Sequence, residues 1–90
     1  MKWSISPETW AQDRDAFVFR CHQPRKGDRW TFLVERGTLE AFAPDDESLP
    51  LTSTFDKLRP IIYAAAFSRM VYADPKQQQR IAIEDLRSVS

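Results

Sequence analysis

The amino-acid sequence predicts an α+β fold, a two-layer sandwich in which an antiparallel β-hairpin and a C-terminal strand pack on two helices. Two segments, 16–21 and 29–35, alternate apolar and polar residues with the period of two that half-buried strands show. A third segment, 55–72, gathers apolar residues on one face, as an amphipathic helix does. Since a hairpin cannot bury its apolar face alone, the helices must supply the second layer.

Length and composition indicate a single cytoplasmic domain. The chain has 90 residues with no repeat or linker, so we expect residues 1–90 to fold as one unit. Its 13 basic and 13 acidic residues cancel, which argues against a dedicated nucleic-acid binder. One cysteine cannot form an intrachain disulfide, and the N-terminus lacks the apolar run of a signal peptide. No segment approaches the roughly 20 apolar residues of a membrane span, so we expect no membrane partner.

The N-terminal half predicts three strands and a turn. Residues 1–5 could form an edge strand, and Pro7 suits the first position of a brief helical turn that carries Glu8 and Trp10. The strands at 16–21 and 29–35 are joined by a polar loop with Pro and Gly, which predicts a hairpin with a longer loop. Their core faces are expected to hold Phe17, Phe19, Cys21, Trp30, Phe32 and Val34.

The C-terminal half predicts two helices and a strand. Residues 36–42 favour a short helix, and 43–52, with two prolines and an acidic cluster at 45–47, an exposed loop. Ser53 or Thr54 is expected to cap the main helix. Pro60 should kink that helix or separate a first turn from a helix that begins near residue 59, and the helix should end before Asp74. Residues 81–83 predict a final strand.

The expected core combines the inner faces of the strands with the apolar faces of the helices. To the strand residues Phe17, Phe19, Trp30, Phe32 and Val34 it adds Leu39, Phe42, Phe55, Leu58, Ile62, Ala65 and Ile83.

Several segments in fixed order point to a known family. They are the letters AFVF at 16–19, FLVE at 32–35, FD at 55–56 with Arg59 and Ile62, and IAIEDL at 81–86. Over roughly Trp10 to Leu86 the chain thereby resembles the small bacterial family catalogued as domain of unknown function 1488. Leu58 stands where that family often carries asparagine, and glutamines at 77–79 replace a glycine-containing connector. The resemblance implies a small cytoplasmic α+β protein and no particular reaction.

The groups that could carry catalysis or metal binding are few. Cys21 and His22 are adjacent on a strand, so their side chains diverge, and we expect a buried Cys21 and a loop-starting His22 rather than a nucleophile and its base. The acidic cluster at 45–47 lacks the alternation and the glycine of a calcium loop. We predict no catalytic residue, no metal and no cofactor, and a protein that is not an enzyme.

Two sets of residues are candidates for binding. Arg59 could pair with a carboxylate of a ligand or partner, or instead with Asp56, Glu84 or Asp85 inside the fold. Four basic residues surround the hairpin loop and could grip phosphates, or could simply be a solvated tip: Arg20, Arg25, Lys26 and Arg29.

We predict a non-enzymatic protein-interaction or self-association module, and as the alternative a weak nucleic-acid binder that uses the basic hairpin loop. One face of the sheet should remain open, with Val18, Thr31 and Leu33 on it, while Trp3 and Trp10 lie outside the main periodic segments. Apolar and aromatic residues so placed favour an interface. The sequence therefore predicts a homodimer formed through the N-terminal segment and the open side of the sheet.

Overall fold

The computed structural model describes residues 4–22, 29–42, 50–70 and 77–89. It confirms the predicted α+β class. In chain order the elements are β1 (Ser4–Ile5), β2 (Thr9–Ala11), the short 3-10 helix η1 (Gln12–Arg14), β3 (Ala16–His22), β4 (Arg29–Glu35), α1 (Arg36–Phe42), α2 (Leu51–Met70), β5 (Gln79–Arg80) and α3 (Ile83–Val89).

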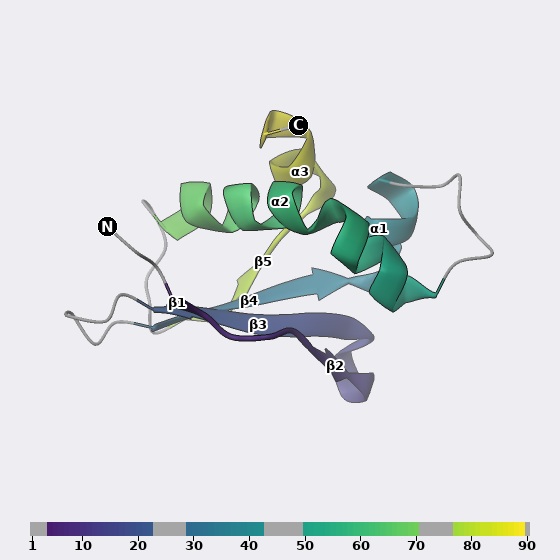
Figure 1. The fold of residues 1–90 in the computed structure, drawn as a ribbon, viewed down its shortest axis with the longest axis horizontal. Coiled ribbons are helices and arrows are strands. Elements are labelled where there is room, and N and C mark those ends of the chain that lie inside the picture. Colours follow the sequence, from purple (N-terminus) through teal and green to yellow (C-terminus); the bar gives the residue numbers. More distant parts are fainter. Residues whose placement is uncertain (1–3, 23–28, 43–49, 71–76, 90) are drawn as a thin grey trace.

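The elements form two layers, a β-sheet and a set of helices that all lie on one of its faces (Figure 1). The strand order is β1-β3-β4-β5, with β2 pairing the other half of β3. β3 and β4 form the predicted antiparallel hairpin, in which Phe19 lies opposite Phe32. β5 runs parallel to β4.

The core lies between the sheet and the helices. Phe19 stacks on Phe32 at a ring-centroid distance of 5.5 Å, and Phe55 of α2 packs on Phe19 at 6.2 Å. Every core residue predicted from the sequence is buried except Phe42 and Ile83, which are half-buried. Phe42 is the last residue of α1 and Ile83 the first residue of α3. Buried Ile81 and Leu86 complete the core instead.

The predicted helical turn at Pro7 is wrong, because the chain there continues along the sheet edge. Trp10 of β2 pairs with Phe17, and Ile5 of β1 pairs with Cys21, so residues 4–5 form the expected edge strand. Between them, residues 6–8 oppose only residues 19 and 20, which makes a β-bulge. Ser6 holds the bulge with two hydrogen bonds to the backbone of Arg20, each of 2.9 Å.

α2 begins at Leu51, two residues before Ser53, which is the first of the two predicted cap residues. It runs through Pro60 as one helix. The carbonyl of Pro50 accepts the N–H groups of Ser53 and Thr54, at 3.0 and 3.2 Å, so the first turn is closed by backbone and not by a hydroxyl cap. The ribbon bends along its first half (Figure 1), which agrees with the expected kink and not with a separate first turn. The predicted helix end near Asp74 and the acidic cluster at 45–47 lie outside the described residues.

The predicted C-terminal strand lies two residues earlier than expected, since β5 spans Gln79–Arg80 and α3 begins at Ile83. The carboxylate of Asp85 accepts the N–H of Ala82 at 2.8 Å, which is half of a capping box. Leu86 then lies in the core, and Val89, three residues later on the same face of α3, packs against it. This capped helical start outweighs the short alternation of isoleucines.

Replacement of Phe32 should remove much of the stability of the domain. Phe32 is fully buried and stacks on Phe19, so Phe32→Ala should lower the free energy of unfolding by about 3–5 kcal/mol. Urea denaturation followed by circular dichroism measures it. Leu33→Ala is the control, because Leu33 is the next residue along β4, points to the opposite face of the sheet and is half-buried. This substitution should lower the free energy of unfolding by less than half as much. Equal losses would contradict this assignment of the strand faces.

Candidate functional site

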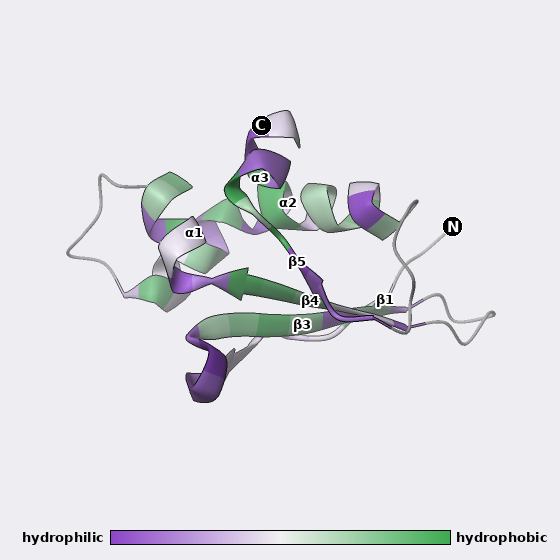
Figure 2. Cartoon of the chain, turned by 180° about the vertical axis from the view of Figure 1, so that it is seen from behind, coloured by the Kyte–Doolittle hydropathy of each residue, from purple (hydrophilic) through white to green (hydrophobic). Residues whose placement is uncertain are grey.

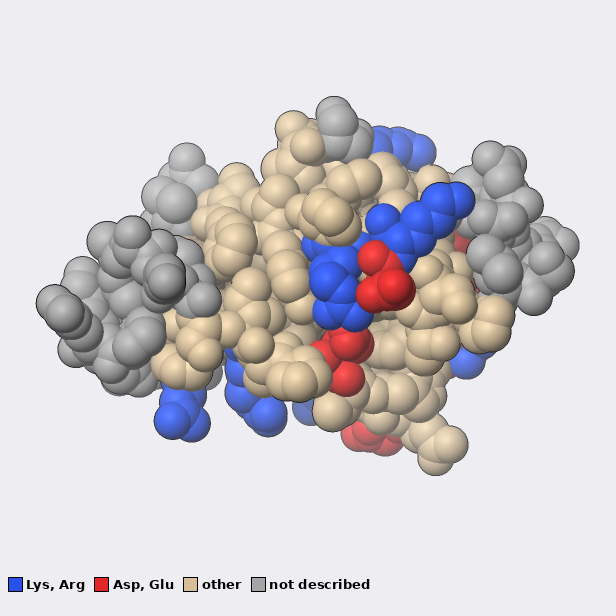
Figure 3. Space-filling view, in the orientation of Figure 1, with Lys and Arg blue, Asp and Glu red and all other residues tan. Residues whose placement is uncertain are grey.

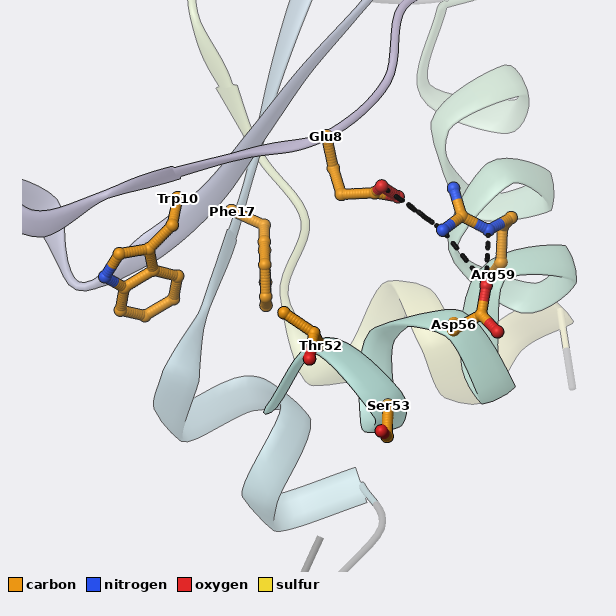
Figure 4. Close-up of a pocket in the computed structure, with 7 residues that line it drawn as sticks. All are labelled: Glu8, Trp10, Phe17, Thr52, Ser53, Asp56 and Arg59. Atoms are coloured by element: carbon orange, nitrogen blue, oxygen red, sulfur yellow. Dashed lines mark hydrogen bonds and ion pairs between the residues drawn. The ribbon is translucent and has the colours of Figure 1, made fainter. Parts of the chain in front are cut away.

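Arg59 joins α2 to the N-terminal strand segment. Its Nη2 lies 2.5 Å from Oε1 of Glu8 and donates to Oε2 at 3.2 Å. Nε and Nη2 also donate to Asp56, one turn earlier on α2, at 3.3 and 3.2 Å, and Nη1 donates to the hydroxyl of Tyr63 at 2.8 Å. The two carboxylates therefore hold the guanidinium between sheet and helix (Figure 4).

The β-bulge is what brings Glu8 to this place. In a regular strand with Ile5 facing the core, residues 7 and 9 would face inward and residues 8 and 10 outward. The extra residue in the bulge reverses this alternation, as any one-residue slip of a strand does. Glu8 and Trp10 therefore both point to the helical side, where Trp10 meets Phe17 and Glu8 meets Arg59.

The two ion pairs of Arg59 differ in their exposure to water. The side chain of Glu8 is 18% exposed and that of Arg59 32%, whereas Asp56 is 75% exposed. Water screens the ion pair with Asp56 more, so the ion pair with Glu8 contributes more to stability. The hydrogen bond to Glu8 is the main cause that raises the pKa of Arg59, and burial opposes it. Oε1 of Glu8 is buried, and its charged neighbour is Nη2 of Arg59.

A pocket of about 390 Å³ opens beside this network, between β2 and the start of α2. Figure 4 shows its lining residues: Glu8, Trp10, Phe17, Thr52, Ser53, Asp56 and Arg59. The hydrogen-bond donors of Arg59 are largely occupied by Glu8, Asp56 and Tyr63. The guanidinium is therefore not poised to receive an anion, and the contacts favour the structural role of Arg59.

Of the three intramolecular partners expected for Arg59, the structure supplies Asp56 and not Glu84 or Asp85. Asp85 binds Arg69 of α2 instead, at 3.0 Å. The main partner, Glu8, was missed because it lies 51 residues earlier in the chain, where a helical turn was expected. Neither Glu8 nor the bulge has a local signal beyond Pro7, whose missing N–H suits a disrupted edge strand.

Cys21 is a core residue. It is fully buried, and burial raises the pKa of its thiol to about 11, so the thiol stays protonated at neutral pH. His22, the next residue on the strand, faces the opposite side of the sheet and is half-buried. Among the residues that the structure describes, no group of three His, Cys, Asp or Glu side chains could hold a metal ion.

The open side of the sheet, which we call the outer face, gathers part of the predicted binding set. Val18 and Leu33 lie opposite each other at its centre, both half-buried. Arg20 and Arg29 are exposed and share this face by alternation. Trp10 does not lie here, since its ring packs at 5.0 Å from that of Phe17. The remaining predicted residues, Trp3, Arg25 and Lys26, lie outside the described ranges.

Comparison with known proteins gave no match to a family model, to a curated protein or to a solved structure. The resemblance to domain of unknown function 1488 therefore stays a prediction. Within the described residues, no helix combines the length and the apolar character needed to cross a bilayer.

A double-mutant cycle should separate the two ion pairs of Arg59. Replacing Glu8 and Arg59 by alanine, singly and together, should give a coupling free energy of about 1 kcal/mol, because this pair is partly shielded from water. The matched cycle of Asp56 with Arg59 should give about 0.3 kcal/mol, as for an exposed pair within one helix. Urea denaturation measures both. Coupling at least as large for Asp56 would contradict the ranking by burial.

The buried thiol should make stability fall at high pH. The folded chain holds the Cys21 proton more tightly than the unfolded chain, so stability is complete below pH 9 and declines as pH rises from 9.0 to about 11. The free energy of unfolding should fall by up to about 2 kcal/mol more than in Cys21→Ala. Denaturation at stepped pH measures this difference. Parallel profiles for the two proteins would show that the thiol does not titrate this way.

Proposed function

We propose that this domain is a non-enzymatic protein-interaction module that binds its partner through the outer face of the sheet. The supporting observation is the one-sided arrangement of the layers. Figures 1 and 2, seen from opposite sides, both place α1, α2 and α3 on the same side of the sheet. None of the three α-helices covers the outer face, which has Val18 and Leu33 at its centre, and of the described helical elements only the short η1 lies on that side.

The chemistry of the outer face supports a protein contact. Val18 and Leu33 form a directly opposed cross-strand pair, and Thr9 and Thr31 lie beside them in the register. A small apolar centre within a polar rim is the usual anatomy of a protein interface. Scattered apolar residues are ordinary on a surface, but a contiguous group in the middle of an open sheet favours a contact.

The other candidate groups fit this proposal better than a reaction. Cys21 is protonated and buried, and Arg59 is bound by Glu8 and Asp56. An activated nucleophile needs a lowered pKa or a base within reach. These residues therefore serve the fold, and the outer face remains as the surface available for binding.

Removal of the apolar centre should abolish binding of the partner. Leu33→Gln keeps the charge and approximate size of the side chain but makes it polar. Ile61→Gln, a half-buried isoleucine on α2 on the helical side, is the matched control. In quantitative affinity purification from the native cells, proteins captured by the unaltered domain should be lost with Leu33→Gln and kept with Ile61→Gln.

Circular dichroism first establishes that both variants are folded. A partner retained equally by both variants would overturn the proposal. The same proteins in light scattering over a dilution series test the homodimer predicted from the sequence, because a dimer through the outer face should dissociate in Leu33→Gln alone.

A further inference from the structure

We infer that the partner of the outer face is an acidic protein surface, with carboxylates beside an apolar anchor, and not a second copy of this chain. This inference rests on the proposed function and adds the chemistry of the partner. It follows from the charges that surround Val18 and Leu33, which the fold collects from segments distant in the sequence.

Positive charge on the outer face is only partly compensated. Arg80 of β5 pairs with Leu33 in the register and forms an ion pair with Glu35 at 3.3 Å, so these two charges cancel. Arg20 and Arg29 are exposed and form no ion pair with any described residue. In Figure 3, basic side chains project downward from the molecule, on the side of the sheet opposite the helices.

The side chain of Arg14 adds to this side. Arg14 follows β2 in η1, which lies on the outer side of the sheet (Figure 1). It donates to the side chain of Gln78, next to β5, and approaches Asp13 at 4.0 Å. Since Asp13 offsets Arg14, the uncompensated charges of the described outer face are those of Arg20 and Arg29.

A second copy would bring the same positive excess to the contact. Opposed like charges are repulsive and suppress binding of the wrong partner. The apolar area is also small, since only Val18 and Leu33 supply aliphatic contact at the centre of this face. Arginine is enriched at protein interfaces, where its planar group binds carboxylates through two parallel hydrogen bonds. An acidic partner satisfies both arginines, whereas a second copy leaves them unpaired.

A nucleic acid fits the same charges less well. Proteins that hold single strands combine basic groups with aromatic rings on which the bases stack. On the described outer face the arginines are accompanied by Val18, Thr31, Leu33 and His22, and the Phe and Trp side chains of β3 and β4 point into the core. Phosphates could bind, but the bases would find aliphatic side chains and only the half-buried imidazole of His22 among the described residues.

The register gives the spacing that the partner must match. Arg20 lies two residues from Val18 along β3, and Arg29 lies four residues from Leu33 along β4, on the same side of the centre. At about 3.3 Å per residue these steps are roughly 7 and 13 Å. Because successive side chains of an extended segment point to opposite sides, the partner needs a leucine followed two and four positions later by acidic residues. Such a segment can place the leucine on the centre and a carboxylate within reach of each arginine.

The test uses three fluorescent probes in anisotropy titrations with the whole domain. They are a leucine–glutamate peptide with the pattern leucine-threonine-glutamate-threonine-glutamate, a leucine–lysine peptide with lysine in place of each glutamate, and oligothymidine. We expect the leucine–glutamate peptide to bind best, and its affinity to fall about tenfold when salt is raised from low to physiological strength or above. Equal binding of the leucine–lysine peptide, or tighter binding of oligothymidine, would overturn the inference.

The double variant Arg20→Glu/Arg29→Glu should bind the leucine–glutamate peptide at least about tenfold more weakly, and it should gain affinity for the lysine peptide. Lys57→Glu/Arg87→Glu, which makes the same change of charge at exposed positions on the helices, is the control and should bind like the unaltered domain. Unchanged binding by the first variant would overturn the inference, as would a dimer that occupies the outer face in light scattering.

The outcomes also separate this inference from the proposed function. If Leu33→Gln loses the cellular partner while the arginine variant keeps it, the interaction module stands and the acidic partner is refuted. If Leu33→Gln keeps the partner, the outer face is not the contact surface and both proposals fail.

Discussion

One-sided burial is the constraint on which the rest of this structure depends. A domain of 90 residues has little apolar material, and a short chain buries a smaller share of its surface than a long one. Here the large side chains are buried in a single core, in which Phe19 and Phe32 of the hairpin contact each other and Phe19 contacts Phe55 of α2. The helices needed to close that interior all lie on one face of the sheet, so the opposite face is left to solvent or to a partner.

The N-terminal edge shows how a local irregularity serves the same interior. An edge strand with a regular alternation would have placed Glu8 outside. The bulge turns it toward α2, where Arg59 compensates its charge, and turns Trp10 onto Phe17. Pro7 and the bulge also interrupt the row of backbone groups that an edge strand would offer to another chain. The charged network that looks most like a binding site therefore fastens the first strands to the helical layer.

Charge is distributed unevenly over the surface, although the formal net charge of the chain is zero. On the helical side Glu8 and Asp56 compensate Arg59, and Asp85 compensates Arg69. Among the described residues of the outer face, Glu35 compensates Arg80, and the two arginines of the hairpin, Arg20 and Arg29, form no ion pair. A formal net charge of zero thus conceals a basic surface, because composition counts charges and the register of the strands decides which of them meet.

The sequence by itself determined the α+β class, the hairpin and its core face, because periods of two and of 3.6 residues are set by backbone geometry and can be recognised within a few residues. It also determined that Cys21 is buried and that Val18 and Leu33 lie on the opposite face. Only the tertiary structure decided where Glu8 points, that residues 83–89 form a helix, and which carboxylate binds Arg59. Each of these depends on a partner distant in the chain or on a cap that competes with a short apolar alternation, so no local pattern could specify it.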